Sequence, residues 1–254
     1  MNQKEVLIII PAYNESANIA GVLEQLQQDN ISKIADVLVM NDYSKDDTKG
    51  TVKKYNETVI SHVYNLGYGS GLQSGYKYAI RKNYKYVIQM DADGQHDICN
   101  IIPIYEELKR KDEDGKLPDI VLGSRFLNKY NEMKESLLKR FAIQLFRMII
   151  YIITHKKISD PTSGLQGLSH RTVLFYSKFS QFDDKYPDAN MIVQMLLLGY
   201  NIREIPAVMH LRSSGESMHS GLKPIVYMIR MFISICAVWV REKILHLDER
   251  VGNE

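Results

Sequence analysis

The stretch KYVIQMDADGQH, residues 85–96, runs from an apolar segment directly into two aspartates one residue apart. The apolar part predicts a buried strand. Asp91 and Asp93 follow at its end, with Gln95 and His96 close behind. Two interpretations are open: a turn that requires polar residues, or a site for a divalent cation and the phosphate that it binds. Paired carboxylates suit Mg²⁺ or Mn²⁺, which take oxygen ligands and fill their remaining positions with water and substrate phosphate.

On either side of this stretch, short apolar runs alternate with segments whose apolar residues recur at helical spacing. The predicted strands are VLIIIP (6–11), DVLVMN (36–41), ETVISHV (57–63), KYVIQM (85–90) and DIVLGS (119–124). The predicted helices between them are residues 16–28, a helix that starts within SKDDT (44–48), residues 72–81 and residues 98–111. VLIIIP has no polar alternation, which indicates a strand covered on both faces. This order predicts an α/β fold with a mostly parallel central sheet flanked by helices.

Polar residues gather where three of the predicted strands end. AYNE follows the first strand, NDYS the second and DADGQH the fourth. In sheets of this kind, ligands bind beyond the carboxyl ends of the strands. The three clusters are therefore expected to border one crevice, with Asp42 of NDYS near Asp91 and Asp93.

The second half of the chain has a different character. ESLLKRFAIQLFRMIIYIITHKK (135–157) predicts a long, broadly apolar helix, and a shorter helix is expected over residues 188–198. A second amphipathic helix with basic flanks is expected over residues 222–247. Core packing explains most such apolar stripes, whereas the basic residues beside them favour contact with anionic lipid. With no repeat and no low-complexity linker, we predict one domain over residues 1–215 and a C-terminal loop and helical extension over residues 216–254.

Composition excludes several classes of protein. The 254 residues include 45% hydrophobic and 24% charged side chains, as in an ordinary globular domain. The formal net charge of +2 gives no argument for nucleic acid as a partner. The two cysteines, Cys99 and Cys236, lie in no metal-ligand or redox spacing, and so few thiols favour a reducing cytoplasm. No apolar run reaches the roughly 18 residues that a membrane-spanning helix needs. The apolar run before Pro11 is too short for a signal peptide.

Six motifs, in this order and spacing, resemble family 2 glycosyltransferases of the GT-A fold. They are IIIPAYNE, NDYSKDDT, NLGYGSGLQSGYKYA, MDADGQH, VLGSRF and SDPTSGLQG, and the resemblance covers about residues 4–215. It is strongest to the branch that includes dolichol-phosphate mannose synthases and bacterial polyprenyl-phosphate sugar transferases. The resemblance implies a GT-A catalytic domain, a nucleotide-sugar donor, Mg²⁺ or Mn²⁺ as cofactor, and inversion at the anomeric carbon. The resemblance therefore favours the interpretation of Asp91 and Asp93 as a metal site over their interpretation as a polar turn.

Carried over position by position, the resemblance assigns roles to individual residues. The nucleotide-sugar site is expected to contain Pro11, Ala12, Tyr13, Glu15, Asp42, Asp91, Ala92, Asp93 and Arg212. The metal ligands are expected to be Asp91, Asp93 and Gln95, and the acceptor's phosphate is expected to bind Ser124, Arg125 and Arg140. The expected catalytic residues are Asp93, which holds donor and metal, and Asp188, the candidate base.

Two places depart from the family's pattern. The family's D-D-G-S is replaced by N-D-Y-S at residues 41–44, so the first acid and the turn glycine are missing. Asn41 can still accept a hydrogen bond and Tyr43 can stack on a ring, which allows a changed donor preference. Relatives often carry glutamates where this chain has Asp188 and Asn190, and Asn190 cannot act as a base. Since a phosphate monoester, with a second pKa of about 6, is already largely ionised near neutral pH, a weak base suits a lipid-phosphate acceptor.

We therefore expect a metal-dependent, inverting transfer of a hexose from a UDP- or GDP-sugar to a polyprenyl phosphate such as undecaprenyl or dolichyl phosphate. Two alternatives stay open: transfer to a glycan hydroxyl in capsule or cell-wall polysaccharide synthesis, and a catalytically weak subunit that binds nucleotide or a partner. The expected location is cytoplasmic and peripheral, on the inner face of the cell membrane. There the chain is expected to dock through its apolar helices or through a small membrane-anchored partner protein.

Overall fold

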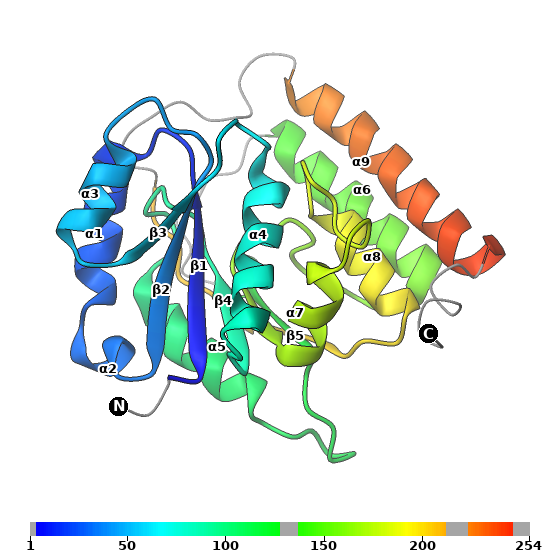
Figure 1. Cartoon of the computed structure of the whole chain (residues 1–254). Coiled ribbons are helices and arrows are strands. Elements are labelled where there is room, and N and C mark those ends of the chain that lie inside the picture. Colours follow the sequence, from blue (N-terminus) through cyan, green and yellow to red (C-terminus); the bar gives the residue numbers. More distant parts are fainter. Residues whose placement is uncertain (1–3, 128–136, 212–222, 246–254) are drawn as a thin grey trace.

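The apolar runs of the first half form most of the central sheet. The computed structural model describes residues 4–127, 137–211 and 223–245, and within these ranges it contains a seven-stranded sheet (Figure 1). Its strands are β1 (Val6–Ala12), β2 (Ala35–Asn41), β3 (Thr58–Ser61), β4 (Tyr86–Gln89), β5 (Ile120–Ser124), β6 (Gln166–Ser169) and β7 (Ile202–Pro206). All five predicted strands are therefore present, and β6 and β7 are additional.

The sheet is mostly parallel, as the sequence predicts. Its strand order is β3-β2-β1-β4-β6-β5-β7, and only β6 runs antiparallel to its neighbours, β4 and β5, among the described strands. In the register of β1 and β2, Ala12 lies beside Asn41. In that of β1 and β4, Ile9 lies beside Gln89. The carboxyl ends of β1, β2 and β4 thus lie at one edge of the sheet, which brings together the polar clusters that follow them.

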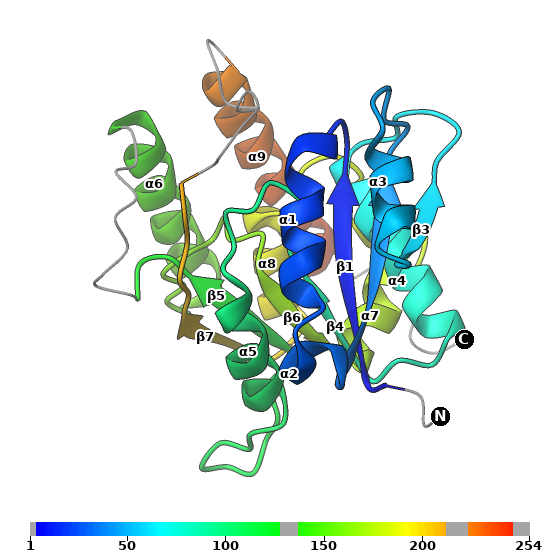
Figure 2. The same ribbon diagram turned by 90° about the vertical axis from the view of Figure 1, so that its left-hand side faces the viewer.

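Helices cover both faces of this sheet (Figure 2). They are α1 (Ser16–Leu26), α2 (Asp29–Ser32), α3 (Thr48–Lys54), α4 (Tyr68–Arg81), a 3₁₀ turn (Ile98–Asn100), α5 (Ile101–Leu108), α6 (Leu137–Thr154), α7 (His170–Ser177), α8 (Ala189–Leu197), α9 (Lys223–Val240) and a π turn (Arg241–Leu245). The predicted helix over residues 98–111 is therefore split into a 3₁₀ turn and a shorter α-helix.

The strand β1 shows why its sequence lacks polar alternation. Leu7 and Ile9 pack into the apolar core that includes α4, α6 and α8, whereas Ile8 and Ile10 pack into the core that includes α1 and α5. All four side chains are buried. Burial of a large aliphatic side chain contributes roughly 1.5–3 kcal/mol to the stability of the fold. Both faces of β1 therefore stabilise the packing of the helices against the sheet.

Helix α4 begins four residues before the predicted start at Leu72, at Tyr68. The preceding Gly67 has φ of 99°, a left-handed conformation that a residue with a Cβ rarely adopts. The backbone N–H of Gly67 also donates to the carboxylate of Asp42. A glycine-rich segment with low helix propensity therefore forms a helix because its first turn is anchored from β2.

The apolar helices α6 and α9 lie side by side on one flank of the molecule, next to α8 (Figures 1 and 2). Helix α9 packs Met231, Ile235 and Val238 inward, where they are buried. Its opposite face is also apolar, with Ile229 and Ile233 more than half exposed. In the described residues, no helix combines the length and the hydrophobicity that crossing a membrane requires.

Candidate active site

The loops that follow β1 and β2 are hydrogen-bonded to each other. The N–H of Asn14 donates to Ser44 Oγ at 2.9 Å, and the N–H of Lys45 donates to Asn14 Oδ1 at 2.8 Å. The N–H of Ser16 donates to Asp46 Oδ2 at 3.0 Å. Asn14 can make these contacts because its φ is 56°, a conformation that asparagine tolerates better than most residues. The loops that carry AYNE and NDYS therefore lie side by side at the carboxyl edge of the sheet, where the crevice is predicted.

The nucleotide residues predicted in the first loop differ in exposure. Pro11 and Ala12 are buried at the end of β1, whereas the ring of Tyr13 is 43% exposed. The carboxylate of Glu15 accepts a hydrogen bond from the Asn18 amide at 2.7 Å. Tyr13 is thus the residue of this loop whose ring face can meet a nucleobase, and the nucleotide role of the loop stays a prediction.

Asp42 holds the loop that precedes α4. Its Oδ1 accepts the N–H of Leu66 at 2.9 Å and lies 2.8 Å from His62 Nδ1. Its Oδ2 accepts the N–H of Gly67 at 2.8 Å. The other ring nitrogen of His62 lies 2.9 Å from Ser74 Oγ on α4. Asp42 therefore fixes the backbone of residues 66–67 at the start of α4. Its predicted contact with the nucleotide stays a prediction.

Asp91, the first aspartate of the opening stretch, is held by two side chains that the sequence did not single out as its partners. Tyr68 Oη donates to its Oδ1 at 3.0 Å, and His96 Nε2 lies 3.1 Å from its Oδ2. Burial alone would raise the pKa of the Asp91 carboxyl, but His96 and Tyr68 hold this pKa below its usual value. On the third side, a Cβ on Gly164 would lie 2.7 Å from Oδ2. The carboxylate is therefore ionised and closely packed.

The remaining residues of the D-x-D segment make hydrogen bonds of their own. Asp93 Oδ1 accepts the N–H of Gln95 at 3.1 Å, and Gln95 Nε2 donates to the carbonyl of His210 at 3.4 Å. Ala92, between the aspartates, is buried. Within the described residues no cluster of three or more His, Cys, Asp or Glu side chains forms a metal site. Two carboxylates and one amide oxygen are nevertheless the sparse, all-oxygen set that suits Mg²⁺ or Mn²⁺ bound together with a phosphate.

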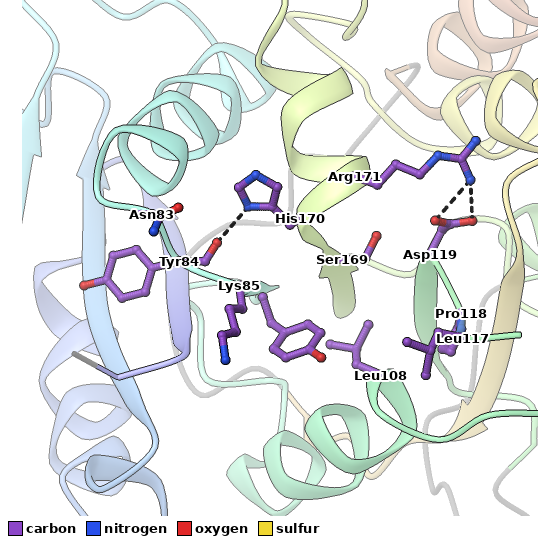
Figure 3. Close-up of a pocket in the computed structure, with 11 residues that line it drawn as sticks. Asn83, Tyr84, Lys85, Leu108, Leu117, Pro118, Asp119, Ser169, His170 and Arg171 are labelled. Carbon is purple, nitrogen blue, oxygen red and sulfur yellow. Dashed lines mark hydrogen bonds and ion pairs between the residues drawn. The ribbon is translucent and has the colours of Figure 1, made fainter. Parts of the chain in front are cut away.

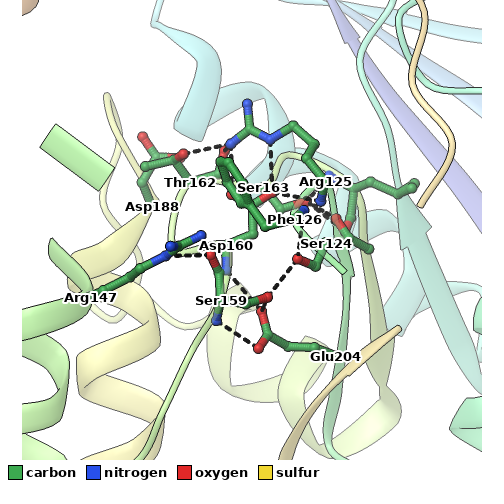
Figure 4. Close-up of polar contacts among 12 residues, drawn as sticks. Ser124, Arg125, Phe126, Arg147, Ser159, Asp160, Thr162, Ser163, Asp188 and Glu204 are labelled. Atoms are coloured by element: carbon green, nitrogen blue, oxygen red, sulfur yellow. Dashed lines mark hydrogen bonds and ion pairs between the residues drawn. The ribbon is translucent and has the colours of Figure 1, made fainter. Parts of the chain in front are cut away.

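Arg125, at the end of β5, is held by a buried carboxylate (Figure 4). Its Nε donates to Asp160 Oδ2 at 2.7 Å and its Nη2 donates to Oδ1 at 2.6 Å, a bidentate ion pair. Nη2 also donates to Thr162 Oγ1 at 2.7 Å. Asp160 is fully buried, and the Arg125 hydrogen bonds outweigh this burial and lower the pKa of its carboxyl. The pair fixes the direction in which the guanidinium points.

A polar network behind this ion pair holds Asp160 in place. The carboxylate of Glu204 on β7 accepts the N–H groups of Ser159 at 2.7 Å and of Asp160 at 2.9 Å. The hydroxyls of Ser159 and Ser124 lie 2.6 Å apart. Ser124 is fully buried, so its hydroxyl belongs to this network, and its predicted contact with the acceptor's phosphate stays a prediction.

The two arginines of α6 have different environments. Arg140, the predicted phosphate ligand, is exposed, and the described residues offer it no hydrogen bond or ion pair. Arg147 reaches inward: its Nε donates to the carbonyl of Ser159 at 2.7 Å, and its guanidinium lies 4.4 Å from the ring centroid of Phe126. Its Nη2 is buried without a hydrogen-bond partner in the described part of the chain. The sequence analysis assigned no role to Arg147, although its charge within an otherwise apolar run is a signal that could have identified it.

Asp188, the candidate base, lies at the start of α8 and faces the same region. Its carboxylate points toward the Arg125 guanidinium in Figure 4, and Tyr227 Oη of α9 donates to its Oδ2 at 2.7 Å. Burial raises the pKa of the Asp188 carboxyl to about 6 and the charge of Asp91 adds to this rise, whereas Tyr227 and Arg125 oppose it. Asp188 is therefore electrostatically coupled to both the D-x-D segment and Arg125. Arg212 lies outside the described residues.

A separate cavity of about 550 Å³ lies at the opposite end of the sheet (Figure 3). Lys85 and Asp119 on its wall precede β4 and β5, so it opens at the amino ends of these strands. Several of its polar groups are paired with each other: His170 Nδ1 lies 3.0 Å from the carbonyl of Tyr84, and Arg171 pairs with Asp119 at 3.2 Å. The candidate active site is therefore the crevice at the carboxyl ends.

Known glycosyltransferases resemble this chain in sequence. The model of the family described as "Glycosyl transferase family 2" matches residues 7–171. The chain is 29% identical over 190 residues to a UDP-N-acetylglucosamine–dolichyl-phosphate N-acetylglucosaminyltransferase of Methanococcus voltae, covering 66% of this chain and 71% of that protein. It is 26% identical over 222 residues to an undecaprenyl-phosphate mannosyltransferase of Micrococcus luteus, covering 85% and 88% of the two chains.

A solved structure confirms the fold. Glucosyl-3-phosphoglycerate synthase from Mycobacterium tuberculosis, crystallised with Mn²⁺, uridine diphosphate and phosphoglyceric acid, superposes with a TM-score of 0.67 at 16% identity, covering 93% of this chain and 78% of that one. The predicted GT-A fold, the polyprenyl-phosphate branch and a hexosyltransferase activity are thus confirmed. The chain belongs to glycosyl transferase family 2.

Proposed function

We propose that this protein transfers one hexose from a UDP- or GDP-sugar to a polyprenyl phosphate, with inversion at the anomeric carbon. The observation that carries the proposal is the placement of Asp188, whose carboxylate points toward the Arg125 guanidinium in Figure 4 and whose pKa is raised further by the charge of Asp91. The polyprenyl-phosphate relatives support the same acceptor class.

Asp91, Asp93 and Gln95 are the residues that would hold a divalent cation. The ionised Asp91 carboxylate, the absence of a Cβ at Gly164 beside it and the all-oxygen donor set fit Mg²⁺ or Mn²⁺. When bound, the cation supplies positive charge opposite the leaving nucleoside diphosphate. The Mn²⁺ and uridine diphosphate of the solved structural relative support this assignment. Tyr68 and His96 keep the Asp91 carboxylate in a single orientation.

Arg125 is proposed to bind the acceptor's phosphate. A guanidinium has five N–H donors and suits the oxygens of a phosphate. Asp160 and Thr162 fix its orientation before the acceptor arrives, so less conformational entropy is lost on binding. Arg147, whose partly buried guanidinium donates from Nε to the carbonyl of Ser159, adds positive charge to the same region.

Asp188 completes the proposed chemistry. An oxygen of the acceptor's phosphate attacks the anomeric carbon while the bond from this carbon to the diphosphate breaks, and this single displacement inverts the configuration. A phosphate monoester has a second pKa of about 6, close to the pKa of about 6 to which burial raises Asp188. Asp188 can therefore accept the proton of an acceptor that arrives as the monoanion.

The outer faces of α6 and α9 are proposed to contact the membrane that holds the acceptor. Their exposed apolar side chains are Leu138, Phe141, Met148, Tyr151, Ile152, Val226, Ile229, Phe232, Ile233, Trp239 and Val240. Neither helix contains an aspartate or a glutamate, whereas Arg140 and Arg230 are exposed on them. Helices with exposed apolar side chains and with basic residues as their only charges favour an interface with anionic lipid. A location on the inner face of the cell membrane, and a membrane-anchored partner protein, both stay predictions.

Vesicle flotation tests this surface. Vesicles that contain anionic phospholipid are expected to carry the full chain, and Ile233→Asp is expected to reduce the bound fraction at least tenfold. Val63→Asp is the matched control because Val63 is 76% exposed but lies after β3, away from both helices. Equal loss in both variants, or none in Ile233→Asp, would remove this surface from the proposal.

Donor binding tests the nucleotide-sugar half of the proposal. Thermal unfolding is measured with a panel of UDP- and GDP-sugars, with and without Mn²⁺. Because a ligand that binds only the folded state stabilises it by mass action, one donor class is expected to raise Tm in the presence of metal. If no nucleotide changes Tm under either condition, the proposed donor is wrong.

A further inference from the structure

Tyr227 joins the apolar helix α9 to the candidate base. Its Oη donates to Asp188 Oδ2 at 2.7 Å. Its ring packs edge-on against Phe146 of α6, with centroids 6.3 Å apart, and against Tyr186, with centroids 5.4 Å apart. Since two separate segments, α6 and residues 186–188, contact this side chain, the hydroxyl has little freedom to move away from Asp188.

A second contact ties the start of α8 to α9. Asn190 is buried, and its Nδ2 donates to Ser234 Oγ of α9 at 2.8 Å and to Asp183 Oδ2 at 2.8 Å. The side-chain oxygen of Asn190 accepts the N–H of Asp188 at 3.0 Å. Asn190, which cannot act as a base, thus links the backbone of Asp188 to α9, and both the backbone and the carboxylate of Asp188 depend on this helix.

We infer that Tyr227 is a positioning residue, which directs the Asp188 carboxylate toward Arg125 and the acceptor's phosphate. This inference rests on the proposed function, because it assigns Asp188 to the acceptor side of the crevice. It also gives α9 two roles: its outer face contacts lipid and its inner face holds Asp188. The family's motifs end before α9, so the sequence alone did not single out Tyr227.

A buried tyrosine hydroxyl usually forms a hydrogen bond with some partner. The test must therefore distinguish a Tyr227 that only stabilises the fold from a Tyr227 that positions the Asp188 carboxylate. The two roles differ in their effect on proton binding. Hydrogen bonding from Tyr227 lowers the pKa of Asp188. The other ionisable groups that act on Asp188 include Asp91, Arg125, Asp183 and Tyr68 of α4, and the substitution that removes the hydroxyl leaves all four in place. Loss of the hydroxyl must therefore raise the pKa of Asp188 if the contact holds the ionised carboxylate.

Tyr227→Phe in the full chain tests the inference, with Tyr186→Phe as the control. Tyr186 is the ring partner of Tyr227, and its own hydroxyl makes no hydrogen bond to Asp188. The first readout is the titration midpoint of the Asp188 carboxyl carbon by NMR, assigned with Asp188→Asn. The second readout is the pH profile of kcat/KM for sugar transfer to polyprenyl phosphate.

Tyr227→Phe is expected to raise the midpoint and to move the acid limb of kcat/KM upward by the same amount, about half a unit to one unit. Below the midpoint this shift lowers kcat/KM about 3- to 10-fold, with little change well above it. Tyr186→Phe is expected to change neither readout. An unchanged midpoint in Tyr227→Phe, or a shifted midpoint with an unshifted acid limb, overturns the inference. If the wild type transfers no sugar while the midpoint still moves, the proposed function fails and the Tyr227–Asp188 contact stands.

Discussion

Replacement of Asp160 by asparagine is the most informative test of the ion pair behind Arg125. Asp160 is fully buried, and its carboxylate accepts from the N–H, Nε and Nη2 of Arg125. Asparagine has nearly the same size and keeps one oxygen. The substitution therefore removes the charge and places an amide NH₂ against a guanidinium N–H, with little change in packing.

The expected loss follows from this burial. Removing one partner of a buried ion pair costs about 3–5 kcal/mol, because the other charge stays uncompensated. The retained oxygen still accepts one hydrogen bond from Arg125, so Asp160→Asn is expected to lower the free energy of unfolding by about 3 kcal/mol at pH 7. Since Arg125 lowers the pKa of Asp160 in the folded state, this contribution is present above the unfolded value of about 3.9 and is lost as pH falls through the folded pKa.

The assay is urea unfolding followed by circular dichroism at pH 7 and again near pH 3. Asp29→Asn is the control, because Asp29 pairs with Lys33 at 3.1 Å on an exposed helix surface. Such a pair contributes about 0.5 kcal/mol or less. The double variant Asp160→Asn with Arg125→Met is expected to recover part of the loss, since it removes the stranded charge. If Asp160→Asn lost no more stability than Asp29→Asn, the buried pair would not hold Arg125.

Three further predictions concern the crevice itself. Burial raises the pKa of Asp188 to about 6, above an unfolded value of about 3.9, so Asp188→Asn is expected to raise the free energy of unfolding at pH 7 by about 1–3 kcal/mol. That gain should vanish near pH 3, where the carboxyl is protonated in both the folded and the unfolded state, and a gain that persists there in urea titrations would contradict the assignment. Asp93→Asn is expected to abolish the donor-dependent rise of Tm in Mn²⁺ while the Tm without ligand stays near wild type; a rise that survives would exclude Asp93 as a metal ligand. Gly164→Ala places a Cβ about 2.7 Å from Asp91 Oδ2 and is expected to weaken Mn²⁺-dependent donor binding at least tenfold by calorimetry. Gly21→Ala on α1, where an added Cβ meets no atom within 4 Å, serves as the control.

Much of the fold could be predicted because its signals are local. Unbroken aliphatic runs such as VLIIIP identify strands covered on both faces, and their alternation with helical segments implies a parallel sheet. The position of DADGQH after β4 then places Asp91 at the carboxyl edge. The strand β6 was not predicted, because four residues that include a glycine carry little periodicity and an antiparallel insertion breaks the alternating pattern.

The partners of the site residues could not be predicted, because they lie far apart in the sequence. Asp160 is 35 residues from Arg125, and Tyr227 is 39 residues from Asp188. Helix α6 illustrates the limit: its apolar run carries Arg140 and Arg147 two turns apart, and spacing alone did not indicate which of them reaches Ser159. The packing of α6 against α8 and α9 determines which of the two arginines faces the interior.

The proposed function is tested most directly by sugar transfer to an isolated lipid acceptor. The full chain is incubated with radiolabelled UDP- and GDP-hexoses, polyprenyl phosphate and Mn²⁺, and in parallel with oligosaccharide acceptors. The account predicts a labelled product that extracts into organic solvent, contains an inverted glycosyl phosphodiester and is absent without metal or in Arg125→Met. Label found only on oligosaccharide hydroxyls, with none in the lipid fraction, would contradict it.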